Sequence, residues 1–159
     1  MIPTPFRQYS TVVPPEWIDI NDHMNARYYT IVIYNAHALF SEYIGFGENY
    51  VQATRCGKSV VESHLIYERE LRVGDRIEVA TRLLSANGKR LHFYHEVFNA
   101  DQNYRAAVSE QLDIHVDLVS RRSTPLPPDL LASLQTIVQA HATLPAADKL
   151  GRCVTTERR

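Results

Sequence analysis

Alternating hydrophobic and polar positions mark much of this chain as β-structure. The alternation runs through residues 5–13, 61–73, 76–83, 91–97 and 106–118. Pro14 and Pro15 end the first of these strands, because proline has no N–H to donate to a ladder. Asn87 and Gly88 form the strongest hairpin signal, since both central residues of a type I′ turn need positive φ. The pattern therefore predicts one early strand and four later strands in series.

A period of three to four residues replaces the alternation from Asn25 to Ile44. This spacing predicts a long helix, which Asn25 or Asp22 caps and which ends at Gly45 and Gly47. Its apolar side chains are spread so widely around the axis that we expect other elements to enclose most of the helix. The residues at helical spacing are Tyr29, Val32, Ile33, Ala36, Leu39, Phe40 and Tyr43.

Prolines at 125, 127 and 128 break the pattern of the last strand, and a shorter amphipathic segment follows at about 129–140. From Pro145 onward the sequence is typical of a tail. We therefore expect one domain over residues 1–144 and a C-terminal tail over residues 145–159.

The order of elements is one strand, a long helix and four strands, which favours an α+β class. An antiparallel sheet wrapped around a central helix satisfies this order, because both elements then bury an apolar face. Such a sheet has open edges that self-association would pair, so we expect a homodimer or a homotetramer.

The last strand carries a row of apolar side chains on one face, and a carboxylate interrupts the row. Glu110 falls on this face, and a buried carboxylate needs partners. A bulge, an interface position or a catalytic role would each explain it. The apolar residues of the row are Ala106, Val108, Leu112, Ile114, Val116 and Leu118.

Composition narrows the class of protein. The 159 residues, 45% hydrophobic and 22% charged, suit one folded, water-soluble domain. A net charge of −1 supplies no positive field for nucleic acid or an anionic membrane. No apolar run approaches the roughly 18 residues of a membrane span, and residues 1–6 lack the regions of a signal peptide. Cys56 and Cys153 form no disulfide framework, which favours a cytoplasmic location.

Residues 19–25 concentrate reactive groups just before the predicted helix: two carboxylates, an imidazole and two amides. A helix N-terminus presents unpaired N–H groups and a positive dipole end, which stabilise an oxyanion forming on a carbonyl. A carboxylate placed opposite would attack that carbonyl or activate water. The structural alternative is that Asp22 or Asn25 caps the helix and the remainder is solvated loop.

Asp19, His23, Met24 and Asn25 resemble the motif Asp-x-x-Gly-His-(Met or Val)-Asn of the 4-hydroxybenzoyl-CoA thioesterase type of hotdog protein. The resemblance covers roughly residues 5–127 and implies a hotdog fold and acyl-CoA thioesterase activity without a cofactor. It implies that Asp19 is the nucleophile or general base, within a catalytic loop that includes His23 and Asn25. Backbone N–H groups near residues 23–25 would hold the thioester oxygen. Asp22 replaces the glycine of the motif, which leaves the identity of the oxyanion donor open.

Residues 62–71, 89–92 and 112–117 resemble the thioesterases associated with bacterial carnitine breakdown, some of which are fused to L-carnitine dehydrogenase. This resemblance implies hydrolysis of betainyl-CoA to glycine betaine and CoA. Because a trimethylammonium group has no hydrogen to donate, aromatic faces are its usual binding partners.

The chain offers several aromatic residues for such a pocket, although ordinary core positions would explain them equally well. Trp17, Tyr28 and Tyr29 flank the loop beside Met24, and we take these four as candidate substrate-binding residues. Tyr67 or Tyr94 would come from the sheet.

Glu62 and His64 are further substrate-binding candidates, because they lie on the polar face of a strand that can reach the partner's site in a hotdog dimer. A solvated strand face is the alternative. His92 and His95 would point to opposite faces of one strand, so we expect no metal site.

Two basic pairs are candidates for binding CoA phosphates by charge-assisted hydrogen bonds, and solvated surface is the alternative for both. They are Lys89 with Arg90 and Arg121 with Arg122.

Acyl-CoA hydrolysis is the leading function, with betainyl-CoA or a general short, medium or aromatic acyl-CoA as substrate. An enoyl-CoA hydratase of the same fold would carry a loop like Asp-x-Asn-Pro-x-His, but no proline precedes His23. A non-catalytic acyl-CoA-binding module is the alternative from another class. No G-x-S-x-G elbow, P-loop or dinucleotide fingerprint is present.

Overall fold

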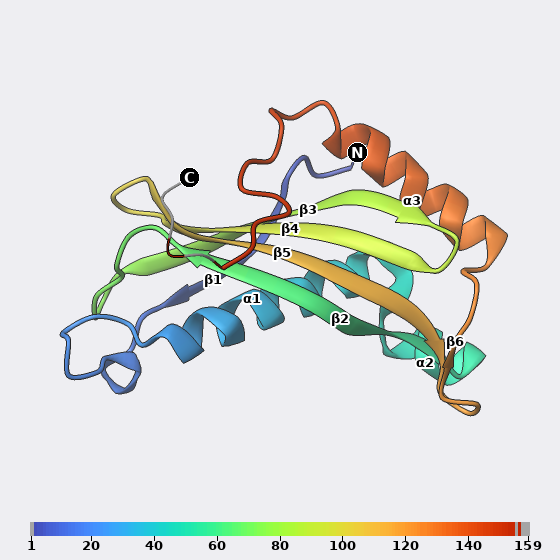
Figure 1. The fold of residues 1–159 in the computed structure, drawn as a ribbon, viewed down its shortest axis with the longest axis horizontal. Helices are drawn as coiled ribbons and strands as arrows, with labels where there is room; N and C mark the ends of the chain where they lie inside the picture. The colour runs from blue at the N-terminus through green and yellow to red at the C-terminus, as the bar shows by residue number, and fades with distance from the viewer. Residues whose placement is uncertain (1, 155, 157–159) are drawn as a thin grey trace.

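The computed structural model describes residues 2–154 and 156 and shows an antiparallel sheet curved around one long helix (Figure 1). The strand order is β1-β3-β4-β5-β2, and a short β6 pairs with β5. The strands are β1 Phe6–Val12, β2 Cys56–Tyr67, β3 Arg76–Asn87, β4 Arg90–Asn99, β5 Tyr104–Asp117 and β6 Arg122–Ser123. The predicted α+β arrangement is therefore confirmed.

The helices follow the local signals of the sequence. Asn25 caps α1 (Ala26–Ser41) by accepting the Arg27 N–H at 3.1 Å. The helix continues into the turn η2 (Glu42–Phe46), where Gly45 adopts a φ of 97° and ends it. The predicted cap and stop are thus confirmed, and so is the second helix, α3 (Pro128–His141). Two short helices were not predicted: η1 (Pro15–Trp17) and α2 (Glu48–Thr54).

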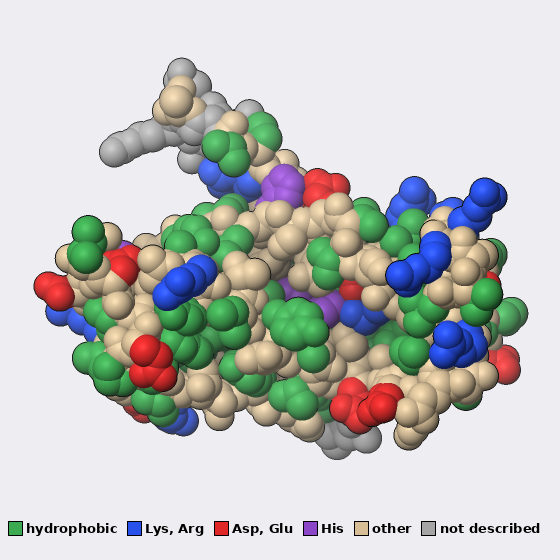
Figure 2. Space-filling view, turned by 90° about the horizontal axis from the view of Figure 1, so that it is seen from below, with side chains coloured by type: hydrophobic (Ala, Val, Ile, Leu, Met, Phe, Trp, Pro, Cys, Tyr) green, Lys and Arg blue, Asp and Glu red, His purple; other side chains and the backbone are tan. Residues whose placement is uncertain are grey.

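One side of α1 is buried and the other is open. Val32 and Phe40 are fully buried against the sheet, within two apolar clusters that form the core. On the opposite side Ile31 and Tyr34 are 43% and 67% exposed, and hydrophobic side chains are visible across this face in Figure 2. The expectation that other elements enclose most of the helix is therefore wrong for the single chain, because the sheet covers only one side.

The second strand is displaced from its predicted position at 61–73. β2 begins at Cys56 and ends at Tyr67, and a bulge between Val60 and Glu62 shifts the alternation by one residue. Beyond the strand, Leu71 is fully buried and its carbonyl accepts the Met24 N–H at 2.7 Å. The chain leaves the sheet here because it turns to pair with the loop before α1.

The hairpin between β3 and β4 also differs from its prediction by one residue. Asn87 pairs with Arg90, so the central residues of the turn are Gly88 and Lys89. Gly88 has a φ of 48°, and a glycine at the first central position is typical of a type II′ turn rather than type I′.

The inner face of β5, which packs toward α1, is polar rather than apolar. Ser109, Gln111, Asp113 and His115 on this face are all buried. Of the predicted apolar row, Leu112, Ile114 and Val116 lie on the outer face and are half-buried, whereas Ala106 is fully buried in the core. Glu110 also faces outward, so no bulge is required to explain its position in the row. Its carboxylate has partners there: it lies 2.8 Å from His92 Nε2 and accepts the Gly151 N–H at 2.6 Å.

Helix α3 covers the half of β3 that β1 leaves unpaired. β1 pairs only with Arg76–Thr81, and beyond this range the Leu83 N–H donates to His141 Nδ1 on α3 at 2.9 Å. Leu134 anchors the helix and is fully buried. Covering the free edge in this way prevents a second chain from pairing there.

The predicted tail packs across the outer face of the sheet, and we call residues 145–152 the strap. It starts over β3 and ends over β2, at the edge of the sheet. Its contacts, in order, are Arg82 with the Pro145 carbonyl at 2.7 Å, Tyr94 with Asp148 at 2.6 Å and His64 with the Arg152 carbonyl at 2.6 Å.

Candidate active site

The loop before α1 is closed by its own backbone. The Asp19 N–H donates to the His23 carbonyl at 3.2 Å, and the Asp22 N–H donates to the Asp19 carbonyl at 3.1 Å. Asp22 has a φ of 59°, in the left-handed region that favours glycine and that aspartate tolerates better than most residues. The residue that replaces the glycine of the hotdog motif therefore adopts a backbone conformation that glycine would also adopt without strain.

Both oxygens of the Asp19 carboxylate accept hydrogen bonds within this loop. Oδ1 accepts the Asn21 N–H at 2.9 Å, and Oδ2 accepts Nδ2–H of Asn25 at 2.9 Å. These two bonds, assisted by the charge of His23, lower the pKa of Asp19 below its ordinary value. The carboxylate is therefore ionised at neutral pH, as a nucleophile or general base requires.

The N–H groups expected to hold the thioester oxygen are partly committed to other acceptors. The Met24 N–H donates to the Leu71 carbonyl, and the Asn25 N–H donates to the Trp17 carbonyl at 2.9 Å. Among the described residues, no acceptor is paired with the N–H of His23 or of Ala26. Ala26 is the first residue of α1, so its N–H lies at the positive end of the helix dipole.

A cavity of about 360 Å³ opens beside this helix N-terminus. Tyr29 and Tyr67 meet edge to face in its wall, with ring centroids 5.2 Å apart. Burial raises the pKa of Tyr29 to about 12, so its hydroxyl stays neutral. The lining residues are His23, Met24, Ala26, Tyr29, Tyr67, Glu68, Arg69 and Glu70. Of the substrate-binding candidates, Met24 and Tyr29 are therefore brought to the Asp19 loop.

Three other aromatic candidates lie outside this cavity. Trp17 and Tyr28 stack on each other at 4.9 Å, and the guanidinium of Arg27 lies 4.6 Å above the Tyr28 ring. Tyr94 lies on the outer face of the sheet, where its hydroxyl donates to Asp148. Tyr29 and Tyr67 are thus the aromatic residues that line the cavity. The sheet contributes Tyr67 to it and not Tyr94.

Glu62 and His64 lie on the outer face of the sheet, away from the Asp19 loop of the same chain. His64 Nε2 is 3.0 Å from Glu62, and the Arg152 carbonyl together with Glu62 raises the pKa of this imidazole. Both residues line a cavity of about 290 Å³. The remaining lining residues are Ser85, Asn87, Arg90, His92, Glu110, Leu112 and Gly151.

The basic candidates gather at the end of the molecule opposite the start of α1. Lys89 Nζ donates to Ser123 Oγ at 2.7 Å, which brings the β3–β4 turn beside β6 with its Arg122. Figure 1 places this end far from the first turn of α1, and Figure 2 shows Lys and Arg side chains gathered there. The single chain therefore does not bring Arg121 or the other three basic candidates to Asp19.

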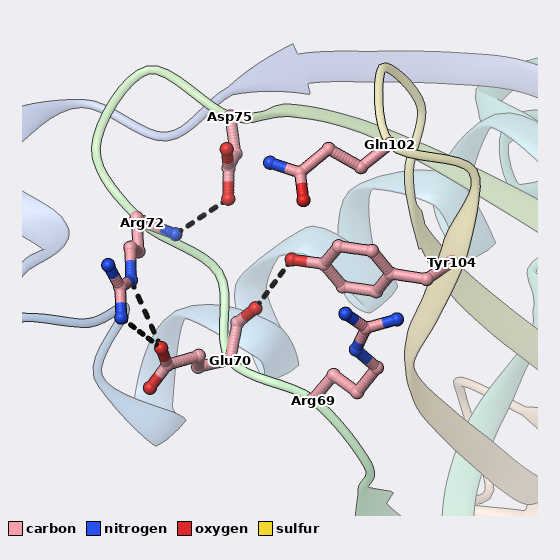
Figure 3. Close-up of a pocket in the computed structure, with 6 residues that line it drawn as sticks. All are labelled: Arg69, Glu70, Arg72, Asp75, Gln102 and Tyr104. Carbon is pink, nitrogen blue, oxygen red and sulfur yellow. Dashed lines mark hydrogen bonds and ion pairs between the residues drawn. The ribbon is translucent and has the colours of Figure 1, made fainter.

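Sequence reasoning missed the segment that follows β2. Figure 3 shows its side chains around a second cavity, of about 220 Å³, next to the first. Arg72 donates to Glu70 Oε1 at 2.5 Å and 3.0 Å, while the guanidinium of Arg69 lies 3.8 Å from the Tyr104 ring centroid. The alternating pattern assigned these residues to a strand, so it gave no signal that they border a site.

A buried polar cluster beneath α1 was also missed. Asp113 Oδ2 lies 2.9 Å from His37 Nε2 and accepts a hydrogen bond from Lys58 at 2.6 Å, and Oδ1 accepts from Gln111 at 2.9 Å. Burial lowers the pKa of both His37 and Lys58. Burial alone would raise the pKa of Asp113, but hydrogen bonding and the charge of Lys58 outweigh it and hold the pKa low. Within the described part of the chain, no three His, Cys, Asp or Glu side chains are placed to bind a metal.

A curved antiparallel sheet, with a reactive loop leading into the helix that it wraps, defines the class of hotdog-fold proteins. The model of the thioesterase-like superfamily matches residues 13–134, and the chain belongs to this superfamily. The hotdog fold and the thioesterase class expected from the sequence are therefore confirmed.

Individual relatives extend the comparison. The chain is similar to the betainyl-CoA thioesterase of Pseudomonas aeruginosa, with 34% identity over 146 residues that cover 92% of each protein. It is also similar to an L-carnitine dehydrogenase/betainyl-CoA thioesterase of Rhizobium meliloti, with 33% identity over 97% of this chain but only 31% of that protein. A Staphylococcus aureus protein solved in complex with CoA shares the fold, with a TM-score of 0.89 and 23% identity over 99% and 98% of the two chains.

None of the helices in the described residues is long and apolar enough to cross a membrane.

Proposed function

We propose that this protein hydrolyses betainyl-CoA to glycine betaine and CoA. The observation that carries the proposal is the ionised Asp19 carboxylate at the N-terminus of α1, next to a cavity lined by two tyrosine rings. The similarity to the Pseudomonas aeruginosa betainyl-CoA thioesterase over nearly the whole chain supports the same substrate.

The loop supplies the groups that thioester hydrolysis needs. The thioester oxygen would accept from the free N–H of Ala26 or His23, where the helix dipole stabilises the developing oxyanion. Asp19 then either attacks the carbonyl carbon or takes a proton from an attacking water. In both routes the C–S bond breaks, CoA leaves as the thiol and water provides the second oxygen of the product carboxylate.

The cavity fits a small, cationic acyl group. A trimethylammonium unit binds to aromatic faces, with a gain of about 0.5–2 kcal/mol that depends on desolvation. Tyr29 and Tyr67 offer such faces beside Met24, directly next to the helix start.

We infer that the active unit is a homodimer or a homotetramer, paired through β2. This strand is an open edge of the sheet, with Val60 and Val61 51% and 54% exposed, and the open side of α1 lies beside it. Antiparallel pairing of two β2 strands would place the Cys56 end of one chain beside the Tyr67 end of the other. The basic residues Arg121 and Arg122 would then lie at the same end as the partner subunit's Asp19, in reach of CoA phosphates.

Light scattering at micromolar concentration tests the assembly. A dimer or tetramer supports it, whereas an active monomer of 18.2 kDa contradicts it. We place the enzyme in the cytoplasm, in keeping with its free cysteines Cys56 and Cys153.

Thiol release from a panel of thioesters tests the substrate. The panel contains betainyl-CoA, its neutral isostere 3,3-dimethylbutyryl-CoA, butyryl-CoA and benzoyl-CoA. We expect the highest kcat/KM for betainyl-CoA. Equal cleavage of the neutral isostere would leave only a general thioesterase, and binding without release of thiol from any member would indicate a non-catalytic acyl-CoA-binding module.

A further inference from the structure

Three consecutive charged residues, Glu68, Arg69 and Glu70, line the cavity beside the start of α1. The first two have partners outside the cavity. Glu68 accepts two hydrogen bonds from Arg105, both at 2.8 Å, and pairs with Lys149 of the strap. The guanidinium of Arg69 lies against the face of the Tyr104 ring, as Figure 3 shows. Both side chains line the cavity, but their charged groups contact partners that do not line it.

Glu70 differs from both neighbours. Its side chain is 49% exposed and turns to the side of the segment opposite Arg69 (Figure 3). Arg72 binds only Oε1, and among the described residues no donor is paired with Oε2. The Arg72 guanidinium, with a smaller effect from His23, lowers the pKa of Glu70, so the carboxylate is an anion within electrostatic reach of the catalytic loop.

An aromatic cavity alone does not distinguish a cation from a neutral group of the same shape by a large factor. Aromatic faces attract both by dispersion, and the cation–π gain is small where water has access. A fixed negative charge at the rim adds a Coulomb attraction that only the cation feels. It needs no donor on the ligand, which suits a trimethylammonium group.

We propose that Glu70 is the residue that makes this cavity select a cationic acyl group, with Tyr29 and Tyr67 providing the apolar contact surface. The proposal rests on the proposed function, because it names the charge that the same site recognises. Arg72 opposes the selection, since its guanidinium pairs with Glu70 and partly neutralises its charge. Removing Glu70 and removing Arg72 should therefore shift the preference in opposite directions.

The experiment compares kcat/KM for betainyl-CoA with kcat/KM for 3,3-dimethylbutyryl-CoA in the full-length wild type and three variants. Glu70→Gln should lower this ratio about tenfold, the scale of one unit charge at a partly solvated site. Glu70→Asp keeps the charge and should retain most of the ratio. Arg72→Gln should raise the ratio several-fold by the same Coulomb argument.

The outcomes separate this proposal from the one on which it rests. If the wild type cleaves both substrates equally, both proposals are overturned. If the wild type prefers betainyl-CoA but Glu70→Gln keeps the ratio, only the role of Glu70 is overturned. Because a structural disturbance lowers both rates together without changing the ratio, a lowered ratio in Glu70→Gln supports a role of the charge itself. If Glu70→Gln fails to fold, Arg72→Gln decides, because an unchanged or lower ratio in that variant contradicts the proposal.

Discussion

Asn25 connects the Asp19 carboxylate to the N-terminus of α1. Its Nδ2–H donates to Asp19 Oδ2 at 2.9 Å, while its Oδ1 accepts the Arg27 N–H at 3.1 Å and caps α1. One side chain thus fixes both the position of the Asp19 charge and the helix end that would stabilise the oxyanion.

Two substitutions of Asn25 separate these roles. Serine caps helices as well as asparagine, so Asn25→Ser should leave the free energy of unfolding within about 0.5 kcal/mol. It removes the hydrogen bond to Asp19, and kcat/KM should fall about tenfold, the scale of a hydrogen bond to a charged group. Asn25→Ala should lose the same activity and also about 0.5–2 kcal/mol of stability. Full activity in Asn25→Ser would show that Asp19 does not need this contact.

Arg105 joins the strap to the sheet, because its guanidinium binds Glu68, Glu96 and Asp148 at 2.7–2.9 Å. Glu68 and Glu96 are only 15% exposed, so Arg105→Gln leaves poorly hydrated carboxylates without their shared cation. We expect a loss of about 2–3 kcal/mol in denaturant unfolding, somewhat below the range for a fully buried pair.

Arg76→Gln is the matched control for Arg105→Gln. It breaks a pair with Asp101 in which both side chains are more than half exposed, and should cost less than about 1 kcal/mol. Equal losses in the two variants would indicate that the strap network adds no stability.

Acidification should weaken the fold between pH 7.5 and 5.5. Burial lowers the pKa values of His37, His95 and His141, so these imidazoles stay neutral in the folded state while the unfolded chain takes up protons below about pH 6.5. Stability from these groups is present above that pH and is lost as the pH falls. His64 has a raised pKa and acts in the opposite direction, but it is a single residue against three.

Denaturant midpoints at the two pH values measure this effect. The wild type should have a lower midpoint at pH 5.5, and His95→Gln should show a smaller decrease because one titrating group is gone. A wild-type midpoint that rises on acidification would contradict the assignment of neutral buried histidines.

The parts of the molecule that the sequence predicts correctly depend on local signals. Asn25 caps α1 and Gly45 ends it, and both act within one helical turn. The hydrogen bonds of the Asp19 carboxylate are equally local, since its two partners, Asn21 and Asn25, lie at most six residues away. These features follow from residue type and spacing without knowledge of the rest of the chain.

The features that the sequence predicts incorrectly are set by contacts between residues that are distant in the sequence. The polar side chains of β5 face α1 because Asp113 pairs with Lys58 and His37, which lie 55 and 76 positions away in the sequence. The strand after α2 ends at Tyr67 because Leu71 turns to bond Met24. For the same reason the side chain of Glu70 beside the cavity could not be found from an alternating pattern.

The most direct measurement of the central claim is the rate of thiol release from betainyl-CoA by Asp19→Asn, with Asp22→Asn as the matched control. Both variants remove one carboxylate from the same loop, and asparagine tolerates the left-handed backbone of position 22. With circular dichroism unchanged, we predict that Asp19→Asn loses roughly a hundredfold or more of kcat, the scale of a lost general base or nucleophile. Asp22→Asn should stay close to the wild type. Near-full activity in Asp19→Asn would contradict the account.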